Sequence, residues 1–111
     1  MKMSPTFFRI QGKGYSLQDM QKYKSCDGSS EAEKHDGLCA SETVEDLRRY
    51  ISGWAIGDMS MFEIVVFKGR KLSRIYDGVL TEPKEIIVRY EFDFFMNDNN
   101  DEELVKHEDC W

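Results

Sequence analysis

Long apolar runs are absent from this chain. No stretch of about 18 apolar residues occurs, so the sequence predicts no helix that crosses a membrane, and we expect no membrane partner. The first residues, Met1-Lys2-Met3-Ser4-Pro5, lack the apolar core of a signal peptide. The cytoplasm is therefore the expected location.

Cysteine is scarce and odd in number. Cys26, Cys39 and Cys110 are the only three, a count that predicts reduced thiols and not a disulfide framework. The spacings His35-x3-Cys39 and His107-x2-Cys110 suit zinc, but no C-x-x-C accompanies them, so we expect no metal. A zinc-stabilised domain is the weakest alternative. Cys39 would have a lowered pKa at the N-terminus of the following helix, and His35 beside it would make a Cys–His pair, but a small buried residue is the favoured interpretation of Cys39.

Net positive charge is also lacking. The chain carries a net charge of −6, and from residue 91 to residue 111 eight acidic residues face one lysine, a net charge of −7. The first 90 residues therefore sum to +1. Binding to phosphates needs a basic face, so the balance argues against nucleic acid as a partner. One basic cluster remains, made of Lys68, Arg70, Lys71 and Arg74.

What the chain does contain is enough for one folded domain. It has 111 residues, of which 41% are hydrophobic and 13% aromatic, as in a globular protein. We expect a single domain over residues 1–96 and an acidic C-terminal tail over residues 97–111. The stretch Phe62–Phe67 holds four consecutive apolar residues, which predicts a strand covered on both faces.

Two helices are predicted in the first half of the chain. After a first strand at Thr6–Gln11, the sequence from Ser16 onward suits a short helix. A second helix is predicted over residues 43–52, with Thr43 as its cap and Gly53 at its end. Its apolar stripe comprises Val44, Leu47 and Ile51, whereas Arg48 and Arg49 lie off the stripe and are expected in solvent.

The second half reads as strands separated by turns. The predicted breaks are a turn at Lys68–Lys71, a turn at Asp77-Gly78 and an interruption at Pro83, and the last strand is predicted over Glu85–Phe94. Strands that follow helices favour the α+β class over a doubly wound sheet. We therefore expect a mixed, mainly antiparallel sheet with two short helices.

Arg9 is the most pointed candidate for a binding residue. It is a guanidinium in an otherwise apolar strand, and such a group binds carboxylates or phosphates, although an exposed strand face explains it equally well. Asp77 and Glu82 flank a short strand where a carboxylate would meet a ligand. Turn chemistry also explains Asp77, and Glu82 also fits a plain edge position.

Several motifs together resemble a known family. They are Phe8-Arg9-Ile10, Gly37–Ser41 leading into Val44–Tyr50, Ile64–Gly69, and Asp77–Pro83. Over residues 6–90 this pattern resembles small bacterial and phage proteins of uncharacterised function with an ADP-ribosyltransferase-like fold. The resemblance implies a split, mixed sheet that holds NAD or a related nucleotide in a cleft.

The resemblance also implies roles for particular residues. Arg9 matches the arginine of the first strand that contacts the dinucleotide, and Ser41 matches the hydroxyl residue that supports the site. The glutamate that polarises the ribose has no direct match, because Gly78 precedes Val79-Leu80. Asp77 lies one residue before Gly78 and Glu82 four residues after it. The candidate catalytic set is therefore Arg9, Ser41, Asp77 and Glu82, with Arg9 and Ser41 binding the cofactor.

Two functions of different classes follow from the sequence. The first is a domain that binds NAD or a related nucleotide, with or without residual transferase activity. The alternative is a non-enzymatic interaction module, such as a phage or mobile-element inhibitor, that docks on a basic protein partner. It would use the acidic tail and exposed aromatic residues, namely Phe94, Phe95 and Trp111.

Overall fold

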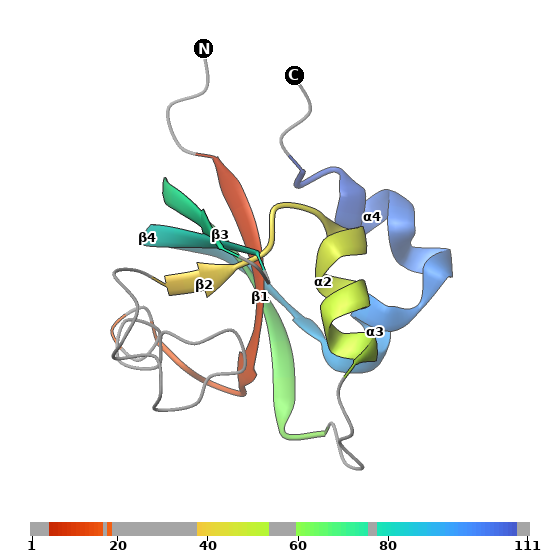
Figure 1. The fold of residues 1–111 in the computed structure, drawn as a ribbon. Coiled ribbons are helices and arrows are strands. Elements are labelled where there is room, and N and C mark those ends of the chain that lie inside the picture. Colours follow the sequence, from red (N-terminus) through yellow and green to blue (C-terminus); the bar gives the residue numbers. More distant parts are fainter. Residues whose placement is uncertain (1–4, 17, 19–37, 54–59, 76–77, 109–111) are drawn as a thin grey trace.

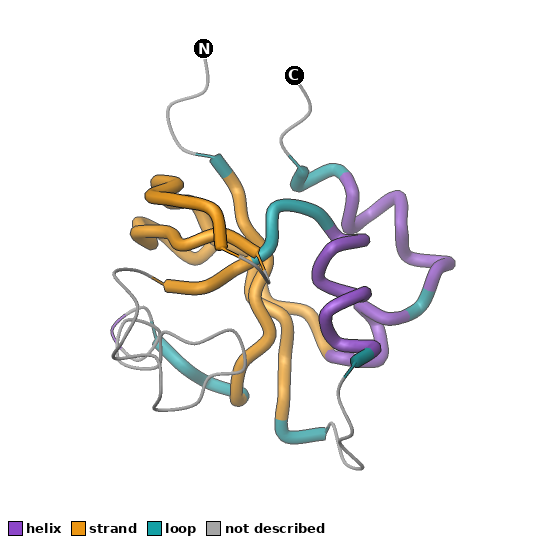
Figure 2. Tube along the Cα trace, in the orientation of Figure 1, coloured by secondary structure: helices purple, strands orange, loops and turns teal. Residues whose placement is uncertain are grey.

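A computed structural model of the protein describes residues 5–16, 18, 38–53, 60–75 and 78–108. Its strands are β1 (Thr6–Gly12), β2 (Leu38–Ala40), β3 (Phe62–Ile75) and β4 (Gly78–Glu91), and its helical elements are α2 (Val44–Ser52), α3 (Phe92–Met96), the 3₁₀ turn η2 (Asp98–Asn100) and α4 (Asp101–Val105). The strands gather on one side and the helices on the other (Figures 1 and 2). The α+β class is confirmed. Of the helix predicted after Ser16, only Gln18 lies within the described residues, and it is helical.

The sheet is antiparallel throughout its described part, which confirms the expected mainly antiparallel pairing; the parallel pairing of a mixed sheet is not found among the described strands. Its strand order is β1-β3-β4-β2. β1 and β2, the two outer strands, also meet. The Phe8 N–H donates to the Ser41 carbonyl and the Ser41 N–H to the Phe8 carbonyl, both over 2.8 Å. The sheet therefore curls until its two edges touch at this pair.

β3 does not break at the predicted Lys68–Lys71 turn, and that prediction is wrong. The strand runs unbroken for 14 residues, with Gly69 inside it opposite Pro83. A Cβ on Gly69 would lie 2.6 Å from the carbonyl oxygen of Glu82. Glycine stands here because a neighbouring backbone approaches closely, a use of glycine that looks like a turn signal in sequence.

Pro83 does not interrupt β4 either. The strand continues from Gly78 to Glu91, and the register shifts at Pro83, where Gly69 pairs with Pro83 and Lys68 with Glu85. Proline lacks an N–H and is tolerated in sheets at bulges and edges. Both conditions hold among the described residues, because β2 pairs with β4 only at Val79–Thr81 and no described strand lies beside Pro83 on that side.

The predicted central strand has two buried faces, as expected. Ile64 and Val66 pack with α2 and with Phe95 and Leu104 of the C-terminal helical segment. Val65 and Phe67 pack on the opposite face with residues of β1, β2 and β4. β3 therefore separates two hydrophobic clusters. No helix in the described part of the chain is long and apolar enough to cross a membrane.

Helix α2 confirms the predicted helix 43–52. Thr43 caps it by accepting a hydrogen bond from the N–H of Asp46 over 3.0 Å. Val44, Leu47 and Ile51 are its buried residues. The stripe therefore faces the core, as its spacing predicts.

The last predicted strand ends early. Glu85–Phe94 was expected to be extended throughout, but β4 stops at Glu91 and Phe92–Met96 form α3. The alternation of Tyr90, Phe92 and Phe94 resembles a half-buried strand, yet Phe95 is the fully buried aromatic of this segment. Turning the chain into a helix at Phe92 places Phe95 in the core.

The close approach at Gly69 gives a test of the fold. Gly69→Ala places a methyl group against the Glu82 carbonyl, and we expect a loss of about 1–3 kcal/mol in the free energy of unfolding, measured by urea denaturation. Gly53→Ala is the control, because its Cβ would meet its nearest neighbour at 3.5 Å. That change should be neutral or slightly stabilising. Equal effects at the two positions would contradict the inferred packing.

Candidate functional site

Arg9 lies inside the protein and not on a solvated strand face. Its side chain is among the largest that are fully buried. The Nη1 atom donates to the Cys39 carbonyl over 2.7 Å, and Nε donates to Oε1 of Gln11 over 3.2 Å. A buried charge is costly unless hydrogen bonds compensate it. Arg9 therefore ties β1 to the backbone of β2.

Ser41 lies close to Arg9. It follows β2 directly, is buried, and forms the backbone pair with Phe8 that closes the sheet. Arg9 and Ser41 both line a cavity of about 10 Å³. Such a cavity has room for about one water molecule, whereas small-molecule sites occupy roughly 300–1,000 Å³. The described residues leave no nucleotide-sized space between Arg9 and Ser41.

The candidate carboxylates do not join this pair in the described part of the chain. Glu82 lies on β4, and its carboxylate pairs with Lys84 over 2.6 Å and with Arg70 over 3.6 Å. A hydrogen bond from Lys84, and then the charges of Lys84 and Arg70, lower the pKa of Glu82 below its usual value. These are the contacts of an exposed strand residue. Asp77 lies outside the described residues.

Cys39 is disulfide-bonded, which corrects the expectation of reduced thiols at this position. The other two cysteines, Cys26 and Cys110, and His35 lie outside the described residues. A disulfide sulfur is neither a nucleophilic thiolate nor a zinc ligand, so neither role fits Cys39 in this state. Among the described residues, no group of three His, Cys, Asp or Glu side chains is arranged to hold a metal.

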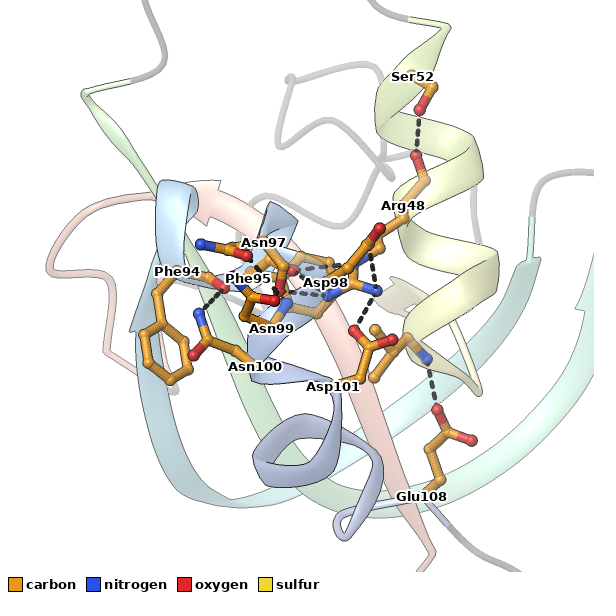
Figure 3. Close-up of polar contacts among 11 residues, drawn as sticks. Arg48, Ser52, Phe94, Phe95, Asn97, Asp98, Asn99, Asn100, Asp101 and Glu108 are labelled. Carbon is orange, nitrogen blue, oxygen red and sulfur yellow. Dashed lines mark hydrogen bonds and ion pairs between the residues drawn. The ribbon is translucent and has the colours of Figure 1, made fainter.

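A second polar centre is built around Arg48 of α2 (Figure 3). Arg48 was expected in solvent, but its side chain is only 17% exposed. Its Nε and Nη2 atoms donate to the Phe95 carbonyl over 2.9 and 2.7 Å. Its Nη1 atom pairs with Asp101 over 2.6 Å and with Asp98 over 3.6 Å. One arginine of α2 therefore fixes the chain from α3 to α4.

Further hydrogen bonds order the same segment. Asn97 accepts from the N–H of Asn99 over 2.9 Å, and the Asn100 amide donates to the Phe94 carbonyl over 2.9 Å. Glu108 accepts from the N–H of Val44 at the start of α2, also over 2.9 Å. With Leu104 buried in the core, residues 97–108 pack against the body of the domain.

This packing gives the protein a surface dense in negative charge. We call residues 92–108 the acidic layer: six carboxylates face one lysine there, a net charge of −5. Asp93 and Glu102 are exposed, as is the apolar side chain of Val105. Phe95 is buried, so its expected role as an exposed docking aromatic is wrong. Phe94 is half-buried and stacks on Tyr90, and Trp111 lies outside the described residues.

Tyr90, Glu103 and His107 form a titratable network at the edge of this layer. The Tyr90 hydroxyl donates to Oε2 of Glu103 over 2.8 Å and lies 2.7 Å from Nε2 of His107. A hydroxyl has one hydrogen, so the Tyr90 oxygen accepts from an Nε2–H on His107. Burial, and then the charge of Lys106, lower the pKa of His107, while Glu103 opposes them. Burial and Glu103 raise the pKa of Tyr90, which makes its hydroxyl a poor nucleophile.

Comparison with known proteins adds no relative. No family model matches the chain, no curated protein matches it, and no solved structure matches its fold.

The disulfide at Cys39 predicts a thiol count. Three cysteines with one disulfide leave one free thiol, which a thiol reagent should detect in the denatured, unreduced protein. Reduction should lower the free energy of unfolding by about 2–5 kcal/mol. Cys39→Ser should abolish the effect of the reductant on stability. Three free thiols in the unreduced protein would contradict the disulfide.

The Tyr90 network predicts a pH dependence of stability. Because the pKa of His107 is lowered in the folded protein, the unfolded chain binds the proton more readily near pH 6.5. Stability should therefore fall as the pH drops from about 7.5 to about 5. Lys106 and Tyr90 also lower the pKa of Glu103, which adds a further loss of stability below pH 4.5.

His107→Gln provides the control for this dependence. Thermal unfolding of the two proteins should show a shallower pH dependence for the variant between about pH 7.5 and about pH 5, a window that brackets the usual histidine pKa. The loss below pH 4.5 should remain in both proteins. Parallel curves over the whole range would show that His107 does not contribute.

Proposed function

We propose that this protein is a non-enzymatic interaction domain that presents its acidic layer to a basic protein partner. The supporting observation is the Arg48 centre, which holds residues 95–101 against α2 through four backbone and side-chain acceptors. A charged surface that is already ordered loses little conformational entropy on binding. The acidic layer has that property.

The chemistry of the layer suits a protein interface. The layer combines exposed carboxylates with the exposed side chain of Val105 and with Phe94, which is half-buried and stacks on the half-buried Tyr90. Interfaces commonly combine an apolar centre with a polar rim. Complementary charge mainly raises the association rate and selects the partner. A partner with lysine and arginine around an apolar patch would match, and nucleic acid would be repelled from this face.

Binding of NAD or a related nucleotide stays a prediction from the resemblance. Arg9 and Ser41 do lie together, as that prediction requires, but both are buried and the cavity between them is small. A titration with NAD tests it directly. Stabilisation of the wild-type protein against heat, lost in Ser41→Ala, would favour nucleotide binding over the interaction domain.

The cytoplasmic location also stays a prediction. The disulfide at Cys39 weighs against it, because disulfides persist mainly in oxidising compartments. A basic partner in such a compartment is compatible with the acidic layer.

Matched charge variants test the proposed function. Asp93→Asn combined with Glu102→Gln removes two exposed charges from the layer, while Glu82→Gln combined with Glu85→Gln removes two from β4. Binding of a lysine-rich peptide with one central tryptophan is measured by fluorescence anisotropy. We expect the first double variant to weaken binding roughly tenfold and to reduce its salt dependence.

The two double variants carry the same net charge, so their comparison separates a defined surface from general attraction. The β4 variant should bind within about twofold of the wild type. Equal weakening by both variants, or no binding by the wild-type protein, would overturn the proposal.

A further inference from the structure

A separate cleft lies between β1, β3 and the start of α2, away from the acidic layer. Its volume is about 280 Å³, close to the lower limit of small-molecule sites. Pro5 and Phe7 contribute apolar surface, Lys71 and Arg74 line it from β3, and Glu42 and Asp46 line it from the helix side. The cleft therefore has an apolar part and two walls of opposite charge.

The two cations reach the same cleft because β3 is bulged. Residues three apart on a regular strand point to opposite faces of the sheet. Here the register shifts between Lys71 and Ser73, since Lys71 pairs with Thr81 and Ser73 with Leu80. The extra residue turns Arg74 to the side of Lys71. Bulges that re-aim side chains in this way are common beside functional sites.

Glu42 forms ion pairs with both cations, Lys71 and Arg74. Its Oε2 atom lies 3.2 Å from Lys71 Nζ, and its Oε1 atom lies 2.8 Å from Arg74 Nη2. The three side chains are between 34% and 69% exposed. Ion pairs this exposed contribute roughly 0–1 kcal/mol, because water screens them. A ligand can therefore exchange with them at small cost.

The four charged side chains of the cleft sum to zero, with two cations on the β3 side and two carboxylates on the helix side. This arrangement decides which ligand fits. A simple anion would meet Lys71 and Arg74 but would also be repelled by Glu42 and Asp46. A ligand that carries an anion and a cation satisfies both walls. We propose that the cleft binds a small zwitterion, of the class of free amino acids and dipeptides.

When the ligand binds, ion-pair partners are exchanged and every charge of the cleft keeps an opposite charge beside it. The ligand carboxylate takes the place of Glu42 at Arg74 and Lys71, and a guanidinium can hold it through two parallel hydrogen bonds. The released Glu42 carboxylate and Asp46 then receive the ligand ammonium. The apolar surface at Pro5, beside the buried Phe7, is left for the side chain. This site is independent of the acidic layer, so either proposal can fail alone.

The test is a titration of the full chain, followed by backbone amide NMR, with the standard amino acids and glycylglycine. We expect at least one of them to shift amides of residues 42–46 and 71–74 with a Kd of about 0.1–1 mM. The best ligand is then compared with its N-acetyl derivative and its methyl ester, each of which lacks one of the two charges. Each derivative should bind about tenfold more weakly.

Matched variants locate the site. Arg74→Gln and Asp46→Asn should each weaken binding about tenfold, whereas Arg70→Gln and Glu45→Gln should not change it. Arg70 lies on the same strand as Arg74 with similar exposure, but it pairs with Glu82. No shift in the cleft with any zwitterion at about 10 mM would overturn the proposal. Equal binding of the methyl ester, or of inorganic phosphate, would also overturn it.

Discussion

The bend of the β3–β4 hairpin determines how the rest of the chain can pack. Two paired strands of 14 residues cannot lie flat against a domain of this size, and three register shifts let them curl. Residues 62–68 of β3 pair with β1, and residues 79–81 of β4 pair with β2. The hairpin thereby brings β1 and β2, which are far apart in the strand order, close enough to meet at Phe8 and Ser41. A straight hairpin would leave two open edges.

The same closure explains why Arg9 and Ser41 are neighbours and why both are buried. Once β2 lies beside β1, the Cys39 carbonyl comes within reach of Arg9, which donates a hydrogen bond to it. A polar group inside a sheet that folds back on itself must be satisfied from within the fold. The need to satisfy buried polar groups therefore explains the hydrogen bonds of Arg9, and no ligand is required for them. The proximity of Arg9 to Ser41 is a consequence of topology, and by itself it does not distinguish a nucleotide site from a sheet closure.

The sequence predicts local features of this fold well and features that depend on distant neighbours poorly. Helix α2 was predictable because its cap and its apolar stripe are encoded within ten residues. Gly69 and Pro83 are typical of breaks in a sequence. Their tolerance in these strands depends on a facing backbone at Gly69 and, among the described residues, on an edge position at Pro83. Arg48 lies off the stripe of α2, and nothing local indicates that carbonyls from residues 95–97 will reach it. The candidate pair of Arg9 and Ser41 was predicted by resemblance, whereas the cleft at Lys71 and Arg74 requires a bulge that no local pattern reveals.

The fold compensates only part of the negative charge of the acidic layer. Arg48 neutralises Asp98 and Asp101 from the inside, Lys106 pairs with Glu103, and Glu108 sits at the N-terminus of α2, where the helix dipole favours an anion. Among the described residues, Asp93 and Glu102 have no such cation, and both are exposed. Like charges repel one another within a Debye length of about 8 Å, so carboxylates left without a cation give the ordered layer some self-repulsion. Cations brought by a partner would relieve it. Binding of a partner should therefore stabilise the acidic layer. This stabilisation should decrease as added salt screens the charges of the layer and of the partner.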